Sequence, residues 1–158
     1  MQWSTEPQAG FSQSSRTILP VISDGPYGFE HVNVAAQRRD PDSMMNWMER
    51  MIRMRKEIPE IGWGDFSFLK VPAAQVLAMR YQWRNNSVVV LHNLGDGPCE
   101  VHLRLGRKSG SNQDLINVLS EDHSLPSSAG THRILLEPYG YRWYRVGGLD
   151  YLLKGSEV

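Results

Sequence analysis

The sequence predicts a mostly β fold, in which an antiparallel β-sandwich follows an irregular segment and one amphipathic α-helix. Residues 1–39 follow no regular period, residues 40–58 follow the helical period, and the chain from residue 66 alternates apolar with polar side chains. Turn residues separate six to eight of these short alternating segments. That pattern is typical of antiparallel sandwiches.

Length and composition fit one small domain with an attached segment. The chain has 158 residues, of which 41% are hydrophobic and 22% charged. Seventeen basic residues balance seventeen acidic ones, which argues against nucleic acid or a membrane as a partner, because both attract clustered basic charge. The single cysteine, Cys99, excludes an internal disulfide. With no signal peptide or apolar membrane span in view, we expect a cytoplasmic location.

The first 39 residues are rich in Gly, Pro, Ser and Gln and predict no regular element. They nevertheless carry many large apolar side chains, which are unusual in a disordered tail. These are Trp3, Phe11, Ile18, Leu19, Val21, Ile22, Tyr27, Phe29 and Val32. We expect this tract to be an active-site loop that lies on a surface; a flexible extension is the alternative.

Residues 40–58 have the start, the period and the stop of one helix. Asp40 suits the N-cap and Pro41 the first helical position, and Pro59 marks the end. The expected apolar face consists of Met44, Trp47, Met48, Met51, Ile52, Met54 and Ile58. We expect part of this face to pack on the β-sandwich. The rest is covered by residues 1–39, covered by a second copy of the chain, or left exposed.

The second half of the chain is predicted to be the sandwich, at residues 66–146. Residues 59–65 are expected to be a linker, in which Glu60 and Asp65 carry solvated charges. The continuous apolar run Val88–Leu91 predicts a central strand that is buried on both faces. Further strands are expected at residues 77–83, 101–105, 115–119, 133–137 and 141–146.

The residue spacing of the sequence shows no catalytic, metal-binding or phosphate-binding motif. The five histidines and the cysteine lack metal-ligand spacing, so no metal and no cofactor is expected. The sequence shows no nucleophile elbow and no phosphate loop, and its carboxylates are not paired as glycosidase chemistry requires. Trp3 and Trp63 lie in predicted loops, where they could stack on sugar rings. Trp47 and Trp83 lie on predicted core faces, where packing explains them better.

Several tracts resemble glycoside hydrolase family 13, the α-amylase superfamily, over about residues 1–146. They are M-Q-W-S at 1–4, A-G-F-S at 9–12, L-P-V-I at 19–22, Y-G-F-E at 27–30, D-P-D-S at 40–43, V-V-L-H-N-L at 89–94 and L-E-P-Y-G at 136–140. The first two resemble the M-Q-W…A-G-F tract of that family. The next three look most like its trehalose synthase branch, and the family subgroup also includes α-glucosidases. The last two look like that family's C-terminal β-domain.

The resemblance implies an assignment for each part of the chain. Residues 1–39 correspond to the loop after the eighth strand of a (β/α)₈ barrel, 40–58 to the last barrel helix, 59–65 to a linker, 66–146 to the C-terminal β-domain and 147–158 to a tail. It also implies that the catalytic Asp, Glu and Asp motifs lie upstream, so that this chain is a non-catalytic fragment and the barrel is its partner. Gln2 and Trp3 then become candidates for lining the sugar site, with support of the loop as an equally open role.

The activity implied for the parent enzyme is retaining glycosyl transfer on α-glucosides such as maltose or trehalose. Isomerisation of maltose to trehalose and hydrolysis of α-glucosides both fit, because the residues that separate them are expected upstream. Two alternatives remain open at this point. The chain could be a stand-alone carbohydrate-binding module, or a structural domain that self-associates through its helix face.

Overall fold

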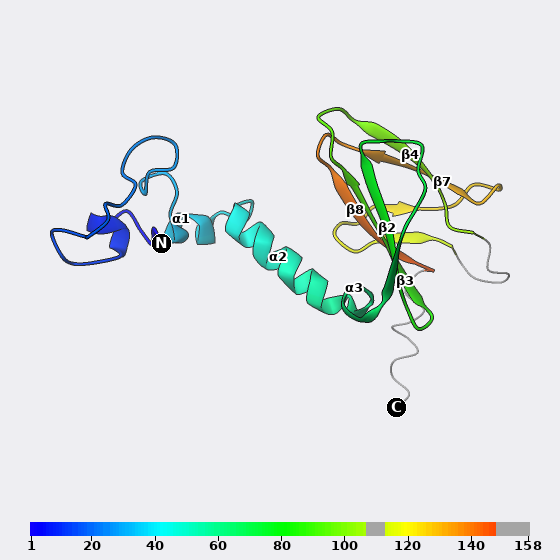
Figure 1. Cartoon of the computed structure of the whole chain (residues 1–158), viewed down its shortest axis with the longest axis horizontal. Coiled ribbons are helices and arrows are strands. Elements are labelled where there is room, and N and C mark those ends of the chain that lie inside the picture. The colour runs from blue at the N-terminus through cyan, green and yellow to red at the C-terminus, as the bar shows by residue number, and fades with distance from the viewer. Residues whose placement is uncertain (107–112, 148–158) are drawn as a thin grey trace. The chain divides into compact units, whose positions relative to one another are not determined.

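The computed structural model describes residues 1–106 and 113–147, and it divides the chain into two units, Met1–Arg53 and Met54–Val158 (Figure 1). Of the tail predicted at 147–158, all but Gly147 lies outside the described residues. The division at Arg53 falls inside the predicted helix. The domain boundaries inferred from the sequence therefore stay predictions.

The first unit begins with a chain segment that hydrogen bonds fold back on itself. It contains the 3-10 turn η1 (Pro7–Gly10) and the short helix α1 (Val34–Arg39), within a tract where no regular element was predicted. The backbone N–H of Ala35 donates to the carbonyl of Trp3 at 2.9 Å, so the start of the chain lies beside the start of α1. The tract from 1 to 39 is therefore ordered by its own backbone contacts.

Helix α2 (Met44–Glu57) begins three residues later than Pro41, the predicted first helical position. Asp40 ends α1 instead of capping α2, and its side chain accepts a hydrogen bond from the backbone N–H of Asp42 at 2.9 Å. Ser43 takes the capping role: its hydroxyl accepts from the backbone N–H of Asn46 at 3.2 Å. The Asp-Pro-Asp-Ser tract thus forms a turn between two helices, because α1 already occupies the residues before it.

The second unit contains the short helix α3 (Pro59–Trp63) and eight strands. The strands are β1 (Asp65–Phe68), β2 (Val76–Trp83), β3 (Asn86–Asn93), β4 (Cys99–Arg104), β5 (Leu115–Asn117), β6 (His123–Ser124), β7 (Thr131–Leu136) and β8 (Tyr141–Val146). One sheet has the order β1-β2-β3-β8-β5-β6, and the other pairs β4 with β7. All the described pairings are antiparallel, which confirms the predicted mostly β fold.

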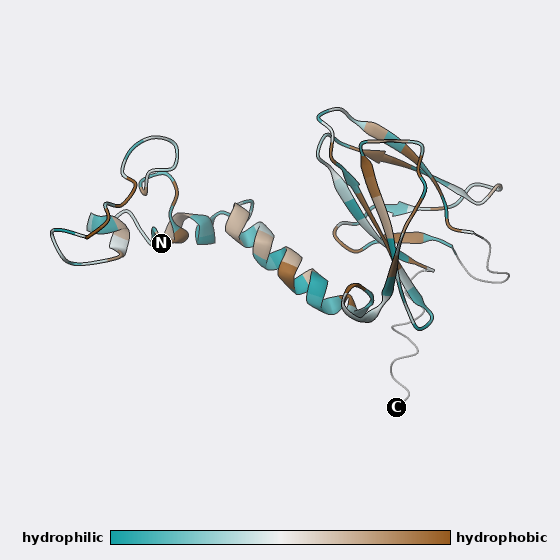
Figure 2. Ribbon diagram, viewed as in Figure 1, coloured by the Kyte–Doolittle hydropathy of each residue, from teal (hydrophilic) through white to brown (hydrophobic). Residues whose placement is uncertain are grey.

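Strand β3 is buried on both faces, as its apolar run predicts. Val89 and Leu91 belong to the larger core, between the six-stranded sheet and the β4–β7 pair. Val88 and Val90 point to the opposite face of the sheet and belong to a second, smaller core. In the colouring of Figure 2 the strands of this unit carry its apolar residues. A run without alternation is what a strand with two covered faces requires.

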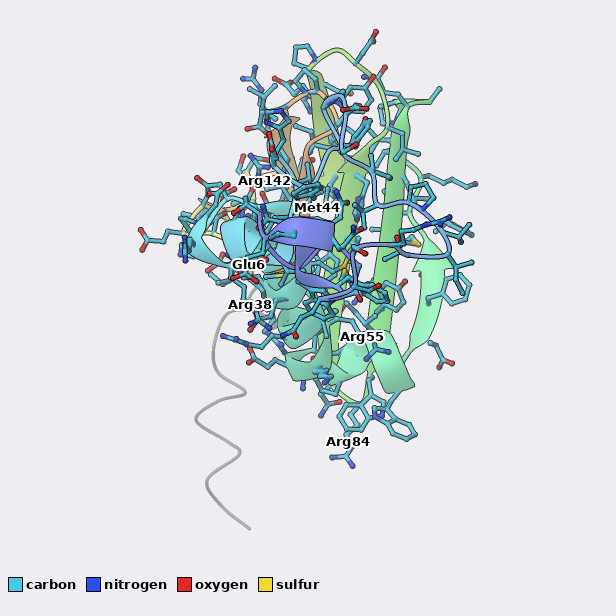
Figure 3. The ribbon with its side chains drawn as sticks, turned by 90° about the vertical axis from the view of Figure 1, so that its left-hand side faces the viewer. Glu6, Arg38, Met44, Arg55, Arg84 and Arg142 are labelled. Atoms are coloured by element: carbon cyan, nitrogen blue, oxygen red, sulfur yellow. The ribbon has the colours of Figure 1, made fainter. Side chains whose placement is uncertain are left out.

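Side-chain contacts hold the turns at the two ends of strand β3. Arg84 and Asn85 connect β2 to β3, and Arg84 adopts a positive φ of 55° while its guanidinium lies 4.3 Å from the centre of the Trp83 ring (Figure 3). At the other end of β3, the Asn93 amide donates to the carbonyls of Gly97 at 2.7 Å and Glu137 at 2.8 Å. One buried side chain therefore ties together two turns.

His132 is the buried histidine of the sandwich. Its Nδ1 lies 3.0 Å from the hydroxyl of Ser124, and its Nε2 has no hydrogen-bond partner among the described residues. Burial lowers the pKa of His132 below its ordinary value of 6.5. Burial in the folded domain therefore favours the neutral form of this ring.

We expect the second unit to lose stability in mild acid partly through His132. In the unfolded chain the His132 imidazole binds a proton near pH 6.5, and in the folded chain it binds one only at lower pH. The stability that the neutral ring contributes is therefore fully present above pH 6.5 and is lost as the pH falls through the pKa that His132 has in the folded state. His132→Gln should make the decrease in unfolding free energy between about pH 6.5 and 5 shallower. Some decrease should remain, because burial also lowers the pKa of His92.

Urea unfolding at stepped pH values measures this dependence. His123→Gln, which removes an exposed imidazole from β6, is the matched control. Identical pH dependence in the wild-type chain and His132→Gln would contradict the assignment.

Candidate functional site

The segment predicted as a linker, residues 59–65, contains helix α3 and leads directly into β1. Pro59 stands at the start of α3, which places Glu60 in the first helical turn. The Glu60 side chain is completely buried, and its Oε1 accepts a hydrogen bond from Nη1 of Arg145 on β8 at 2.9 Å. The prediction that Glu60 carries a solvated charge is therefore wrong.

A signal for this ion pair was present in the sequence. Arg145 follows Tyr141 and Trp143 at the spacing of one strand face, so a charge stands in a row of aromatic side chains. A buried guanidinium needs a carboxylate partner. The Pro-Glu start of α3 supplies one. By contrast, Asp65 is exposed, as expected.

Helix α3 covers part of the face of the six-stranded sheet that points away from the β4–β7 pair. Ile58 is buried there against Val88 and Val90. Partly buried apolar side chains complete this second core, namely Met54, Ile61, Met79, Tyr81, Val118 and Trp143. The last turn of α2 thus packs on the sheet through Met54, and the buried ion pair adds a polar contact to the same joint.

The same face continues to strand β1 as an aromatic edge, formed by the exposed Phe66 and Phe68 beside the partly buried Tyr81. Phe66 pairs with Tyr81 in the sheet register, and their ring centres are 6.2 Å apart. Phe66 and Phe68 meet edge to face at 5.9 Å. Phe66 is 61% exposed and Phe68 68% exposed, which is unusual for two phenylalanines side by side. This aromatic edge is therefore a candidate interaction surface.

In the first unit, the apolar stripe of α2 is also open. Met44, Met48 and Ile52 are exposed, although they follow one another at helical spacing along one face. The folded tract before the helix exposes further large apolar side chains, which are Trp3, Phe11, Ile18, Leu19, Ile22 and Tyr27. Within the first unit itself, this part of the helix face is therefore left uncovered. Its cover in the whole chain stays a prediction.

The two residues predicted to line a sugar site have different positions. The Gln2 amide donates to the carbonyl of Tyr27 at 3.0 Å and to that of Ile22 at 3.4 Å, so this side chain holds the loop together. The Trp3 side chain is about half exposed. Contact of either residue with substrate stays a prediction.

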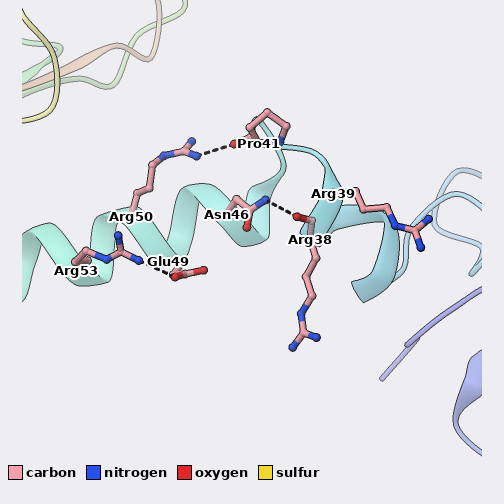
Figure 4. A pocket seen from close by; sticks show the side chains of 7 residues that line it. All are labelled: Arg38, Arg39, Pro41, Asn46, Glu49, Arg50 and Arg53. Atoms are coloured by element: carbon pink, nitrogen blue, oxygen red, sulfur yellow. Dashed lines mark hydrogen bonds and ion pairs between the residues drawn. The ribbon is translucent and has the colours of Figure 1, made fainter.

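An open surface cavity of about 310 Å³ with a strongly basic lining lies at the bend between α1 and α2 (Figure 4). Its lining residues are Arg38, Arg39, Pro41, Asn46, Glu49, Arg50 and Arg53. Arg53 pairs with Glu49 at 2.9 Å, and Nη1 of Arg50 donates to the carbonyl of Pro41 at 2.6 Å. The sequence placed Arg38 and Arg39 in the irregular tract and the other five residues in the predicted helix, so it did not bring them together.

Within residues 1–106 and 113–147, no group of three His, Cys, Asp or Glu side chains is placed to hold a metal ion. The helices of the described chain include none that is both long and apolar enough to cross a membrane.

Comparison with known proteins shows where such a fold occurs. Residues 86–145 match the family model of the sucrose hydrolase-like C-terminal domain. The chain is 29% identical to the trehalose synthase of Thermus thermophilus over 97% of its own length, and 31% identical to that of Pimelobacter sp. (strain R48) over 95%. It spans only 16% and 27% of these two relatives.

A solved structure shares the fold. The trehalulose synthase MutB from Pseudomonas mesoacidophila MX-45 superposes on 92% of this chain with a TM-score of 0.67, at 23% identity, and the match takes up 24% of that enzyme. Fold and sequence together match this chain to one class of protein region, the C-terminal region of α-amylase family enzymes. The chain corresponds to the C-terminal region of glycoside hydrolase family 13 enzymes, with trehalose synthases and an α-glucosidase among its relatives.

Proposed function

We propose that this chain serves as the C-terminal region of a trehalose synthase-like enzyme. Its β-sandwich covers and stabilises a catalytic barrel and takes no part in the chemistry itself. The match to a limited part of two trehalose synthases, over nearly all of this chain, supports the assignment. We further propose a cytoplasmic location for the enzyme.

The observation that carries this proposal is the aromatic edge of Phe66, Phe68 and Tyr81. Burying a phenylalanine side chain contributes about 1.5–3 kcal/mol of free energy, and Phe66 and Phe68 do not gain it while they are exposed. A partner surface that covers them gains this free energy. The open stripe of Met44, Met48 and Ile52 on α2 supports the same conclusion independently.

The reaction proposed for the enzyme is retaining glycosyl transfer on α-glucosides. Relatives of the chain are named trehalose synthase and α-glucosidase, and a MutB variant has been crystallised with its substrate sucrose. Isomerisation of maltose to trehalose is the activity we favour, because both trehalose synthases match over nearly the whole chain.

Two measurements test the non-catalytic role. The purified chain should release neither glucose nor trehalose from maltose, and reproducible turnover by it would overturn the proposal. The genomic sequence upstream of Met1 should continue in frame into a barrel with Asp, Glu and Asp catalytic motifs. A stop codon there, with no such frame, would also refute it.

The docking role predicts a specific loss in the double variant Phe66→Ser/Phe68→Ser. When the chain is co-expressed with the Pimelobacter trehalose synthase shortened to its remaining N-terminal part, the wild-type chain should co-purify with it. The double variant should bind at least about tenfold more weakly, because aromatic anchors dominate interfaces. Leu135→Ser is the matched control, since Leu135 is 61% exposed on β7. Failure of the wild-type chain to associate, or equal loss in the control, would argue against docking through this edge.

A second candidate function, sugar binding, is favoured by Trp63. This side chain ends helix α3 and is 80% exposed, which suits a platform for a sugar ring. Titration with maltose and trehalose, followed by tryptophan fluorescence, tests it against Trp63→Ala. A saturable response that disappears in the variant supports sugar binding, and no response up to about 10 mM sugar rejects it.

A further inference from the structure

The cavity between α1 and α2 is held in shape by hydrogen bonds. The Asn46 amide donates to the carbonyls of Gln37 at 2.9 Å and Asp40 at 2.7 Å, which fixes the end of α1 against the start of α2. On the other side, Arg50 reaches the carbonyl of Pro41. These contacts bridge the turn between the helices, so the cavity walls are set before any ligand arrives.

The charge of this cavity is far from that of the whole chain. Four arginine residues line it against one glutamate, whereas the chain as a whole carries no net charge. Glu49, that glutamate, is already paired with Arg53. Asp40 and Asp42 belong to the neighbouring turn but are not among the lining residues. The cavity therefore holds a local surplus of positive charge.

Two of the four arginines have their guanidinium groups available. The structure shows no hydrogen bond or ion pair for the Arg38 and Arg39 side chains with any other described residue. Both are exposed at the end of α1 (Figure 4). Guanidinium groups offer planar, paired N–H donors that match the oxygens of a phosphate.

We propose that the cavity lined by Arg38, Arg39, Arg50 and Arg53 binds the phosphate group of a small molecule. The ligand class is a phosphate monoester or free inorganic phosphate. Arg38 and Arg39 bind the oxygens, while Arg50 and Arg53 contribute positive field from α2. A volume of about 310 Å³ has room for a phosphate with a small organic group attached. This site is separate from the aromatic edge and does not depend on the function proposed above.

The test uses the 158-residue chain and isothermal titration calorimetry in a low-salt buffer free of phosphate. Inorganic phosphate and glucose 6-phosphate are the two probes, and glucose is the uncharged control. We expect both phosphates to bind saturably, with affinity that falls as sodium chloride is raised, because screening weakens contacts at an exposed site. Equal affinity for the two identifies a site for phosphate alone, and tighter binding of glucose 6-phosphate shows that the sugar is also contacted.

The double variant Arg38→Gln/Arg39→Gln should weaken phosphate binding about tenfold or more, because it removes both available guanidinium groups. The control Arg104→Gln/Arg133→Gln removes the same charge from the strands β4 and β7 and should leave binding within about twofold. Far-UV circular dichroism and thermal melting check that each variant is folded. No saturable binding up to about 10 mM phosphate, equal loss in the control, or equal binding of glucose would each overturn the proposal.

Discussion

Replacing Glu60 with alanine is expected to destabilise the second unit by about 3–5 kcal/mol. The substitution removes the carboxylate and leaves the guanidinium of Arg145 in a site where only 6% of its side chain is exposed. A buried charge that loses its partner carries the full penalty of desolvation. The loss should appear as a lower urea midpoint with tryptophan fluorescence as the probe.

The exposed ion pair of the same chain is the control for this experiment. Glu49→Ala breaks the pair with Arg53, whose side chains are about two thirds exposed, and should change stability by less than about 0.5 kcal/mol. The double variant Glu60→Ala/Arg145→Met should recover part of the loss, because it also removes the buried charge that the Glu60 carboxylate had balanced. If Glu60→Ala were no more harmful than Glu49→Ala, the buried ion pair would not be formed in solution.

Leu91→Ala is expected to destabilise the sandwich by about 2–5 kcal/mol. Leu91 lies in the middle of β3, fully buried in the larger core. Truncation removes three carbon atoms and opens a cavity, since neighbours on both sheets cannot all move to fill it. Urea unfolding of the wild-type and variant chains measures the difference.

Leu94→Ala makes the same chemical change three residues away, just beyond the end of β3. Leu94 is 65% exposed, so its truncation should change stability by no more than about 0.5 kcal/mol. Similar losses in the two variants would contradict the assignment of Leu91 to the core.

Much of the sandwich could be predicted because short strands carry their periodicity locally. The run from Val88 to Leu91 predicted a strand with two covered faces, and the structure places alternate side chains in two separate cores. The family followed from ordered tracts rather than from periodicity. Both conclusions rest on information contained within a few neighbouring residues.

The remaining features depend on contacts between distant residues. Glu60 lies far from Arg145 in the chain, so neither sequence context alone shows that the two are paired. The start of α2 was misplaced because Asp40 and Pro41 also suit the end of one helix and the turn to the next. The basic cavity was missed for a related reason: its arginines come from two helices, and only the bend between them creates a concave surface.

The order of the six-stranded sheet has a consequence for how the protein is made. Strand β8 lies between β3 and β5, and Val90 pairs with Trp143. While the chain emerges from the ribosome, β1, β2 and β3 can form a meander, but the sheet stays open along β3 until residues 141–146 have been synthesised. Closing it joins distant segments, which is slow and leaves an apolar strand edge unpaired in the meantime. We expect nascent chains that stop short of β8 to be targets for chaperones, and complete ones to escape them.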